Sequence, residues 1–216
     1  MSIEHHPTNE MLAAFAAGTL DHGQHIAIAT HLLACRQCKE FVRSMEQVGG
    51  AVLAELPPAT MSNRALAEVE GRLNETKKPT GAPMIPALAE TEVPGLPKFV
   101  RRYRFGTWKW IAPSVHLRPI ELPYASETRV FLLKSGPGTK MLQHTHTGIE
   151  MTCVLAGAFR QDGAHYGPGD FDLGDETIDH RPMVEEGQDC ICLVAMQGDL
   201  QLKGLIGRMV QPFIRL

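Results

Sequence analysis

The segment ATHLLACRQC places a histidine and two cysteines at the spacing of a metal site. His31 and Cys35 are four residues apart, so in a helix they lie one above the other on the same face. Cys38 follows one turn later, and Cys-x2-Cys is a common half of a tetrahedral zinc site. A fourth ligand is needed, and His6 or His5 can supply it. A thioredoxin-like redox pair is the alternative, but that motif belongs at a strand-to-helix junction in a βαβ unit, which this region lacks.

A second group of metal-binding residue types lies in the segment GTKMLQHTHTGIEMTCVLAG, which begins at residue 138. Side chains alternate along a strand, so His144, His146 and Glu150 are expected to share one face. Burying two imidazoles and a carboxylate together is costly without a cation, which predicts a metal. A fourth ligand would come from an opposing strand, and His180 is the best candidate. Imidazole and carboxylate suit Zn, Fe, Mn, Ni or Cu alike, so these residue types alone do not identify the metal.

Two further cysteines, Cys190 and Cys192, share a face of a predicted strand close in sequence to His180. Buried cysteines are most often small apolar core residues, and that interpretation stands beside a redox or signalling role.

Composition narrows the cellular setting of the 216-residue chain, whose formal net charge is −3. The N-terminus, MSIEHHPTNE, lacks the basic and apolar regions of a signal peptide. No apolar run approaches the roughly 20 residues of a membrane span. No predicted helix has the positive charge of a DNA-recognition helix, so we expect no membrane and no direct nucleic acid. The expected location is the cytoplasm, where the five cysteines stay reduced and serve metal or redox roles.

The first 75 residues are predicted to be helical. Thr8 can cap a first helix that ends at Gly18, and two further helices are expected over about 23–34 and 36–56. A fourth helix, capped by Ser62, carries an apolar stripe that is either ordinary core or a face for a partner. The stripe consists of Ala65, Leu66, Val69 and Leu73.

Residues 76–98 contain five prolines and two glycines and are predicted to be a linker. Beyond it, short β-rich segments alternate with Gly, Pro and Asp turns, which is typical of an all-β sandwich or barrel. These segments read VHLRPIEL, TRVFLLK, MTCVLAGAF, CICLVAM and MVQPFIRL. The predicted fold class is therefore a two-domain chain, α then β.

Both clusters resemble motifs of known families. The pattern G-x5-H-x-H-x3-E-x6-G, formed by Gly138, His144, His146, Glu150 and Gly157, is similar to the first cupin motif. The second cupin motif is recognisable in Pro168, Gly169 and Asp170, although His180 follows later than usual and His165 is the alternative ligand. The segments HHPTNEMLAAFAAGTL and HLLACRQC resemble the zinc-binding anti-sigma domain, whose signature is His-x3-Cys-x2-Cys with an upstream histidine.

Together, in this order and over essentially the whole chain, the motifs resemble the ChrR family of anti-sigma factors. The resemblance implies a zinc-stapled helical anti-sigma domain over 1–75 and a cupin domain, a double-stranded β-helix or jelly-roll barrel, over 99–216. It implies zinc on His6, His31, Cys35 and Cys38. It also implies a second divalent metal, with zinc preferred over iron, manganese or nickel, on His144, His146, Glu150 and His180.

The partner that the resemblance implies is an extracytoplasmic-function sigma factor, whose RNA polymerase-binding surfaces the helical domain would occupy. The apolar stripe with Leu66, Val69 and Leu73 is the expected contact. The cupin domain would sense oxidative stress, such as singlet oxygen or organic hydroperoxide, and trigger release, with Cys190 and Cys192 as a candidate relay. We expect a regulator and not an enzyme.

The strongest alternative is a cupin metalloenzyme, a dioxygenase or isomerase, with a helical accessory domain. An enzyme would need a second acid or a substrate-clamping arginine beside the metal. No such residue is obvious near the motif, although Arg129, Arg160 and Arg181 lie in the same region of the sequence.

Overall fold

The structure is a computed structural model, which describes residues 3–74, 93–123 and 126–202. Four α-helices come first: α1 (Asn9–Ala16), α2 (His22–Ala34), α3 (Arg36–Glu55) and α4 (Ala65–Asn74). This order confirms the predicted helical half of the chain. Among the described helices, none has the length and hydropathy that a membrane span requires.

Local capping explains where the helices begin. The Thr8 hydroxyl accepts from the Met11 N–H at 3.3 Å, and Gly18 follows α1 with a φ of 68°, a conformation that suits glycine. Asp21 and Gln24 form a capping box at the start of α2. The prediction for the fourth helix was wrong at its start. The backbone carbonyl of Ser62, and not its side chain, accepts from the Ala65 N–H, so α4 begins three residues after Ser62.

The regular structure in the remainder of the described chain consists of β-strands, preceded by a short 3-10 helix over Val100–Arg102. The strands are β1 (Arg104–Phe105), β2 (Lys109–Ala112), β3 (Val115–Glu121), β4 (Thr128–Ser135), β5 (His144–His146), β6 (Glu150–Ala156), β7 (Phe159–Gln161), β8 (Ala164–Tyr166), β9 (Phe171–Gly174), β10 (Met183–Val184), β11 (Cys190–Gln197) and β12 (Leu200–Leu202). Of the five segments read as β-rich, MVQPFIRL lies outside the described residues.

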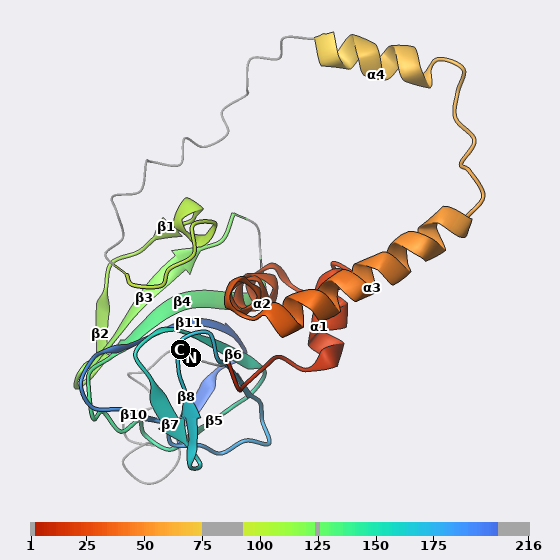
Figure 1. Cartoon of the computed structure of the whole chain (residues 1–216). Helices are drawn as coiled ribbons and strands as arrows, with labels where there is room; N and C mark the ends of the chain where they lie inside the picture. The colour runs from red at the N-terminus through yellow and green to blue at the C-terminus, as the bar shows by residue number, and fades with distance from the viewer. Residues whose placement is uncertain (1–2, 75–92, 124–125, 203–216) are drawn as a thin grey trace.

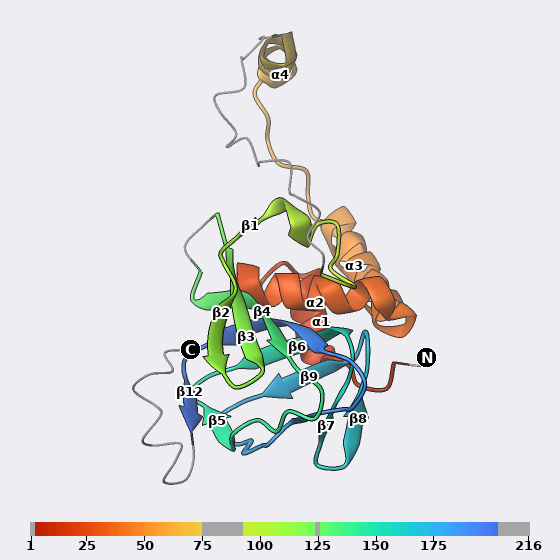
Figure 2. The same ribbon diagram turned by 90° about the vertical axis from the view of Figure 1, so that its left-hand side faces the viewer.

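The strands form three antiparallel sheets that enclose a barrel. The large sheet has the order β1-β3-β4-β11-β6-β9, with β2 added to β3. Two smaller sheets, β10-β7-β8 and β12-β5, close the opposite side. Figure 2 shows helices α1 to α3 on one side of the large sheet and the small sheets on the other. The barrel interior is therefore bounded by all three sheets.

Both faces of the large sheet are buried, and this explains its continuous apolar sequences. On β11, Cys192, Val194 and Met196 point into the barrel, whereas Leu193 and Ala195 belong to the core under the helices. A sheet with one wet face would show polar residues at alternate positions, and CICLVAM does not. The helices therefore supply the second cover of this sheet.

The helical layer and the barrel share one hydrophobic core. Ile26, Ala27 and Ile28 of α2 are fully buried in the cluster that contains Leu132 and Leu193 of the sheet. The predicted helical and cupin regions are therefore in direct contact and are not held together by the segment 76–98 alone. Gly23 makes the approach possible, because a Cβ there would lie 2.7 Å from the side chain of Thr128 on β4.

The linker is shorter than the predicted range 76–98, because its last residues pack on the barrel. Most of it lies outside the described residues, but Val93 and Leu96 are buried in the shared core. Gly95 has a φ of 73° and passes directly over the backbone of Leu155, where no side chain would fit. The segment from residue 93 onward is therefore anchored on the barrel by apolar burial, despite its Pro- and Gly-rich composition.

The far end of α3 and the whole of α4 extend beyond this core. Figure 1 shows α3 projecting from the helical layer and α4 standing away from the sheet. Large apolar side chains along both are exposed, namely Val48, Val52, Leu53, Leu56, Leu66, Val69 and Leu73. These two helices therefore present apolar side chains that the described chain does not cover.

Candidate metal centres

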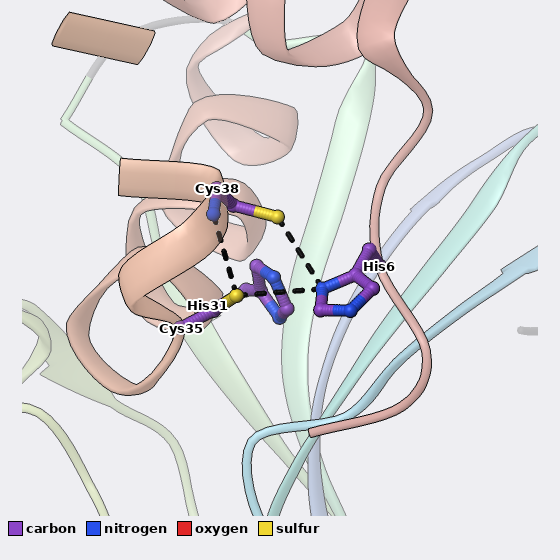
Figure 3. A group of neighbouring side chains, drawn as sticks. All are labelled: His6, His31, Cys35 and Cys38. Atoms are coloured by element: carbon purple, nitrogen blue, oxygen red, sulfur yellow. Dashed lines mark hydrogen bonds between the residues drawn. The ribbon is translucent and has the colours of Figure 1, made fainter. Parts of the chain in front are cut away.

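The N-terminal cluster assembles four side chains from three elements. His6 lies on the extended segment before α1, His31 on the last turn of α2, Cys35 between α2 and α3, and Cys38 on the first turn of α3. Their ligand atoms all lie within 4.8 Å of one another. Figure 3 shows both sulfurs directed toward the His6 ring, with the His31 ring beside them.

Distances within the cluster match a set of ligands converging on one point. His6 Nδ1 lies 3.4 Å from the sulfur of Cys35 and 3.4 Å from that of Cys38. The Cys38 backbone N–H donates to Cys35 Sγ at 3.4 Å, as expected where a Cys-x2-Cys turn opens a helix. His5 is not part of the group, because its ring stacks on Tyr166 at 3.9 Å between centroids.

His31 has one ring nitrogen that is suited to bind a metal. Its Nδ1–H donates to the carbonyl of Gly169 at 2.8 Å, which leaves Nε2 with a lone pair. That Nε2 is buried and has no hydrogen-bond partner among the described residues. Burial also lowers the pKa of His31 to about 4, so the imidazole is neutral and able to bind a cation.

The thiols of Cys35 and Cys38 also indicate that this cluster binds a cation. Burial, together with the neighbouring Cys35, raises the pKa of Cys38 to about 12, so a thiolate is unfavourable here without a positive charge. Zinc reverses that preference, because it binds cysteine as the thiolate. Two sulfurs and two imidazoles are a Cys2His2 donor set, which is typical of a closed structural zinc site.

The second cluster lies inside the barrel and contains three histidines. His144 and His146 come from β5, and His180 is held against β5 by backbone hydrogen bonds to His144 in both directions. Their ligand nitrogens lie within 4.8 Å of one another, and Nε2 of His146 is 3.1 Å from Nε2 of His180. The structure thus brings together three of the four predicted ligands.

Outer hydrogen bonds orient two of these rings. His144 Nδ1–H donates to the carbonyl of Leu142 at 2.7 Å, and His180 Nδ1–H donates to Oε1 of Gln161 at 2.8 Å. Both rings therefore direct a lone pair from Nε2 into the cluster. Burial lowers the pKa of all three histidines, that of His180 to about 4. A proton is thus disfavoured between the imidazoles, and a divalent cation fits.

Glu150 departs from the predicted arrangement. The expectation of one continuous strand from His144 to Glu150 was wrong, because the chain turns after His146 and Glu150 opens β6 in the large sheet. Its Oε2 lies 3.8 Å from His146 Nδ1, and its carboxyl is outside the group formed by the three histidines. Burial raises its pKa, although the nearby His144 acts in the opposite direction.

The alternative ligand His165 lies elsewhere. It is on β8, where its ring is half exposed and forms an ion-pair contact with Glu185 at 3.0 Å. Two buried residues beside the centre were not anticipated: Gln161, which orients His180, and Asp172, whose pKa burial raises. Alternation along β7 and β9 would have placed them inward only once those short strands were known.

A cavity of about 140 Å³ opens beside the histidines. It is lined mainly by apolar side chains, together with His144, Glu150 and His180. Cys190 and Cys192 also line it, with their sulfurs 3.7 Å apart, and both are free thiols. The hydrogen bond with Cys190, followed by burial, raises the pKa of Cys192 well above its usual range, which makes its thiolate scarce.

The predicted contact stripe of α4 is outward-facing. Leu66, Val69 and Leu73 are 71%, 53% and 79% exposed, which favours a partner-binding face over a core face. The apolar end of α3, with Val48 and Val52, was not predicted as a surface. Its apolar residues recur at helical spacing, and the signal available was a helix too long for the core beneath it.

A histidine cluster inside a small antiparallel barrel defines the β-rich half as a cupin, here covered by helices that carry a Cys2His2 cluster. Residues 99–199 match the family model described as the ChrR cupin-like domain. The whole chain is 34% identical over 217 residues to the anti-sigma-E factor ChrR of Cereibacter sphaeroides, covering 100% of both sequences. The chain therefore belongs to the ChrR family of anti-sigma factors.

A solved structure agrees with this assignment. The crystal structure of Rhodobacter sphaeroides SigE in complex with the anti-sigma ChrR matches with a TM-score of 0.73 and 30% identity. The match covers 91% of this chain and 100% of that chain. Membership of the family confirms the predicted resemblance and the prediction that the protein is a regulator, and the cupin-enzyme alternative falls with it.

Proposed function

We propose that this chain is an anti-sigma factor that sequesters an extracytoplasmic-function sigma factor and releases it under oxidative stress. The observation that carries the proposal is the uncovered apolar surface of α3 and α4 in a chain of the ChrR family. An anti-sigma factor acts where the sigma factor would meet RNA polymerase, so we propose a cytoplasmic protein.

The binding surface is a pair of amphipathic helices. The stripe of Leu66, Val69 and Leu73 and the end of α3 around Val48 and Val52 present apolar side chains to solvent. Such helices dock into apolar grooves of a partner through anchors at i, i+3 and i+7 spacing. The nine residues 56–64 between α3 and α4 lack regular structure apart from a turn, so the two helices can contact a sigma factor from two sides.

The N-terminal cluster would hold zinc as a structural staple. Zinc on His6, His31, Cys35 and Cys38 would join the segment before α1 to the α2–α3 junction, and so fix the direction in which α3 projects. The orphaned Nε2 of His31 and the buried thiols support this assignment.

The cupin cluster would be the sensor. His144, His146 and His180, with Glu150 beside them, would hold a divalent metal, for which we favour zinc over iron, manganese or nickel. The adjoining cavity gives a small molecule access to imidazole and thiol groups that singlet oxygen or an organic hydroperoxide oxidises. Cys190 and Cys192, on the wall of that cavity, are the proposed relay.

The test of sigma binding is a charge on the α4 stripe of the full chain. Leu66→Asp should weaken binding to the sigma factor from the same cell by about 30-fold, the equivalent of ~2 kcal/mol at a central apolar contact. Because Leu66 is exposed, the variant should keep the circular dichroism spectrum of the unaltered protein.

The matched control is Trp110→Asp, which places the same charge on an exposed apolar residue of β2 in the cupin. It should bind the sigma factor normally. Equal binding by Leu66→Asp and the unaltered protein would contradict the proposed contact, and failure of the unaltered protein to bind would contradict the function.

A further inference from the structure

One short segment of the cupin touches both candidate metal centres. It consists of the turn Gly167–Asp170 and the strand β9 that follows it. The turn lies against the N-terminal cluster. Strand β9 then runs beside β6 to the histidine cluster. At about 3.3 Å per residue, the three steps from Phe171 to Gly174 span about 10 Å.

Asp170 attaches the turn to the segment that carries His6. Its Oδ1 accepts from the backbone N–H of Glu4 at 2.8 Å and of His5 at 3.0 Å, and its Oδ2 accepts from the N–H of Gly167 at 2.8 Å. The Phe171 N–H adds a bond to the carbonyl of His5 at 3.1 Å. Asp170 is buried, so its carboxylate depends on these donors, and together they position the residue before His6.

The same turn holds His31. The Gly169 carbonyl accepts from His31 Nδ1–H at 2.8 Å, and the His31 ring packs edge-on against Phe171 at 5.7 Å between centroids. Gly169 has a φ of 95°, and a Cβ there would lie 2.8 Å from Ile3 and 3.0 Å from Ala34. Two of the four N-terminal ligand positions are thus set by a turn that belongs to the cupin.

The other end of β9 abuts the histidine cluster. Gly174 pairs with Glu150 across the β9–β6 ladder. A Cβ on Gly174 would lie 3.1 Å from the ring of His146 and 3.6 Å from the Cβ of Glu150. The strand therefore has no room to shift at this end without displacing a candidate metal ligand.

From this arrangement we infer that the Gly167–Gly174 segment couples the two metal centres, with Asp170 as the residue that positions the N-terminal ligands. A change of ligand position at the histidine cluster moves β9, and β9 moves the hydrogen-bond acceptors that hold His31 and the His6 segment. The inference deepens the proposed function and rests on it, because it supplies the contact by which a cupin sensor reaches the sigma-binding helices.

The sharpest variant is Asp170→Asn in the full chain. Both carboxylate oxygens of Asp170 accept hydrogen bonds, whereas an asparagine has one acceptor oxygen and must turn its NH2 toward a backbone N–H. Replacing a partner that orients a metal ligand typically lowers metal affinity by about 10- to 100-fold, and we expect a loss in this range at the Cys35/Cys38 site.

Cobalt(II) reports on that site alone. When bound by thiolates it gives intense near-ultraviolet absorption, and in the described chain only the N-terminal cluster combines cysteines with histidines. Cobalt-loaded protein is challenged with a chelator, and the loss of the thiolate bands is followed. Asp170→Asn should lose them about tenfold faster or more, while the histidine cluster still takes up its metal. A variant that merely destabilised the fold would lose metal from both sites.

Asp162→Asn is the matched control, because it makes the same chemical change at an exposed position in the β7–β8 turn. It should retain cobalt like the unaltered protein. Equal retention by Asp170→Asn would overturn the role of Asp170. Absence of thiolate bands in the unaltered protein would instead count against the proposed zinc site.

The coupling itself is measured by loading the cupin. A coupling of the usual size changes the affinity of the N-terminal site for cobalt by about 5- to 150-fold. Adding Mn²⁺, which favours imidazole and carboxylate ligands over thiolates and binds more weakly than cobalt, loads the histidine cluster without displacing cobalt and should change the rate of cobalt loss. The change should be smaller in Asp170→Asn. An unchanged rate in the unaltered protein would overturn the inference.

Discussion

The two candidate metal centres of this chain are built in opposite ways. The N-terminal cluster combines two sulfurs and two imidazoles and presents a complete set of four ligands. The cupin cluster has three imidazoles, a carboxyl that stands slightly apart, and a cavity of about 140 Å³ at its side. Closed sets are typical of structural zinc, whereas a site that meets a cavity retains a position for chemistry.

Stability and response are thus divided between two parts of one fold. The closed centre lies where the extended segment before α1 meets the α2–α3 junction, so its loss should affect the architecture. The open centre lies inside a barrel whose walls are held by their own hydrogen bonds, so its loss should affect the signal and leave the fold intact. Variants of the two centres should therefore differ in what the protein loses.

The largest effect should come from Cys38→Ser. Structural zinc contributes on the order of 10–16 kcal/mol in small zinc-binding peptides, far more than a few short helices supply. The variant should lose one zinc per chain, part of its helical circular dichroism signal and its sigma binding. Cys153→Ala, which alters a buried cysteine outside both clusters, should keep its metal. Full metal content in Cys38→Ser would show that the closed centre is misassigned.

A different outcome is expected for His144→Ala. Metal analysis should show one metal fewer per chain, while sigma binding and the helical signal remain. In cells, sigma-dependent reporter output should stay low after exposure to singlet oxygen or hydroperoxide, because the sequestering helices work without the switch. His165→Ala, half exposed and outside the cluster, should respond normally. Normal induction by His144→Ala would remove the cupin metal from the signal path.

Acid should lower the stability of the metal-free protein. Burial lowers the pKa of His31 and of His180 to about 4, below the ordinary value of 6.5. Between these values the unfolded chain binds protons that the folded chain does not, so stability falls as the pH drops from about 6.5 to about 4. The loss is of the order of 3 kcal/mol for each histidine. Thermal unfolding of the chelated protein across this range measures it, and a flat profile would contradict the burial argument.

The smallest effect is expected from the double variant Cys190→Ser and Cys192→Ser. The raised pKa of Cys192 leaves little reactive thiolate, so the pair should assist the response and not carry it alone. Reporter induction should be reduced but present, with metal content unchanged. An effect as large as that of His144→Ala would move the sensor from the metal to the thiols.

The sequence predicted local features well because they depend on local spacing. His31, Cys35 and Cys38 are brought together by one helix end and one turn, and the first three helices begin and end within one or two residues of the expected positions. The recognised cupin motif likewise indicated His144 and His146. In both cases the signal lies within about ten consecutive residues.

What the sequence analysis missed depends on contacts between distant segments. Gln161 accepts a hydrogen bond from His180, which lies 19 residues further along the chain, and no periodicity relates the two. The break of the strand before Glu150 depends on the turn at Gly148, where a Cβ would collide with the backbone of Gln197. The helical cover of the large sheet could have been predicted, because CICLVAM has no polar residue for a solvent-exposed face.

The bare apolar length of α3 and α4 has a consequence for the lifetime of the chain in a cell. Exposed leucines and valines on projecting helices are what chaperones and proteases recognise in unfinished proteins. A copy without its sigma factor would therefore be degraded faster than a copy in complex. The amount of inhibitor would then follow the amount of sigma factor, and a small release of sigma factor would not be masked by a surplus of free inhibitor.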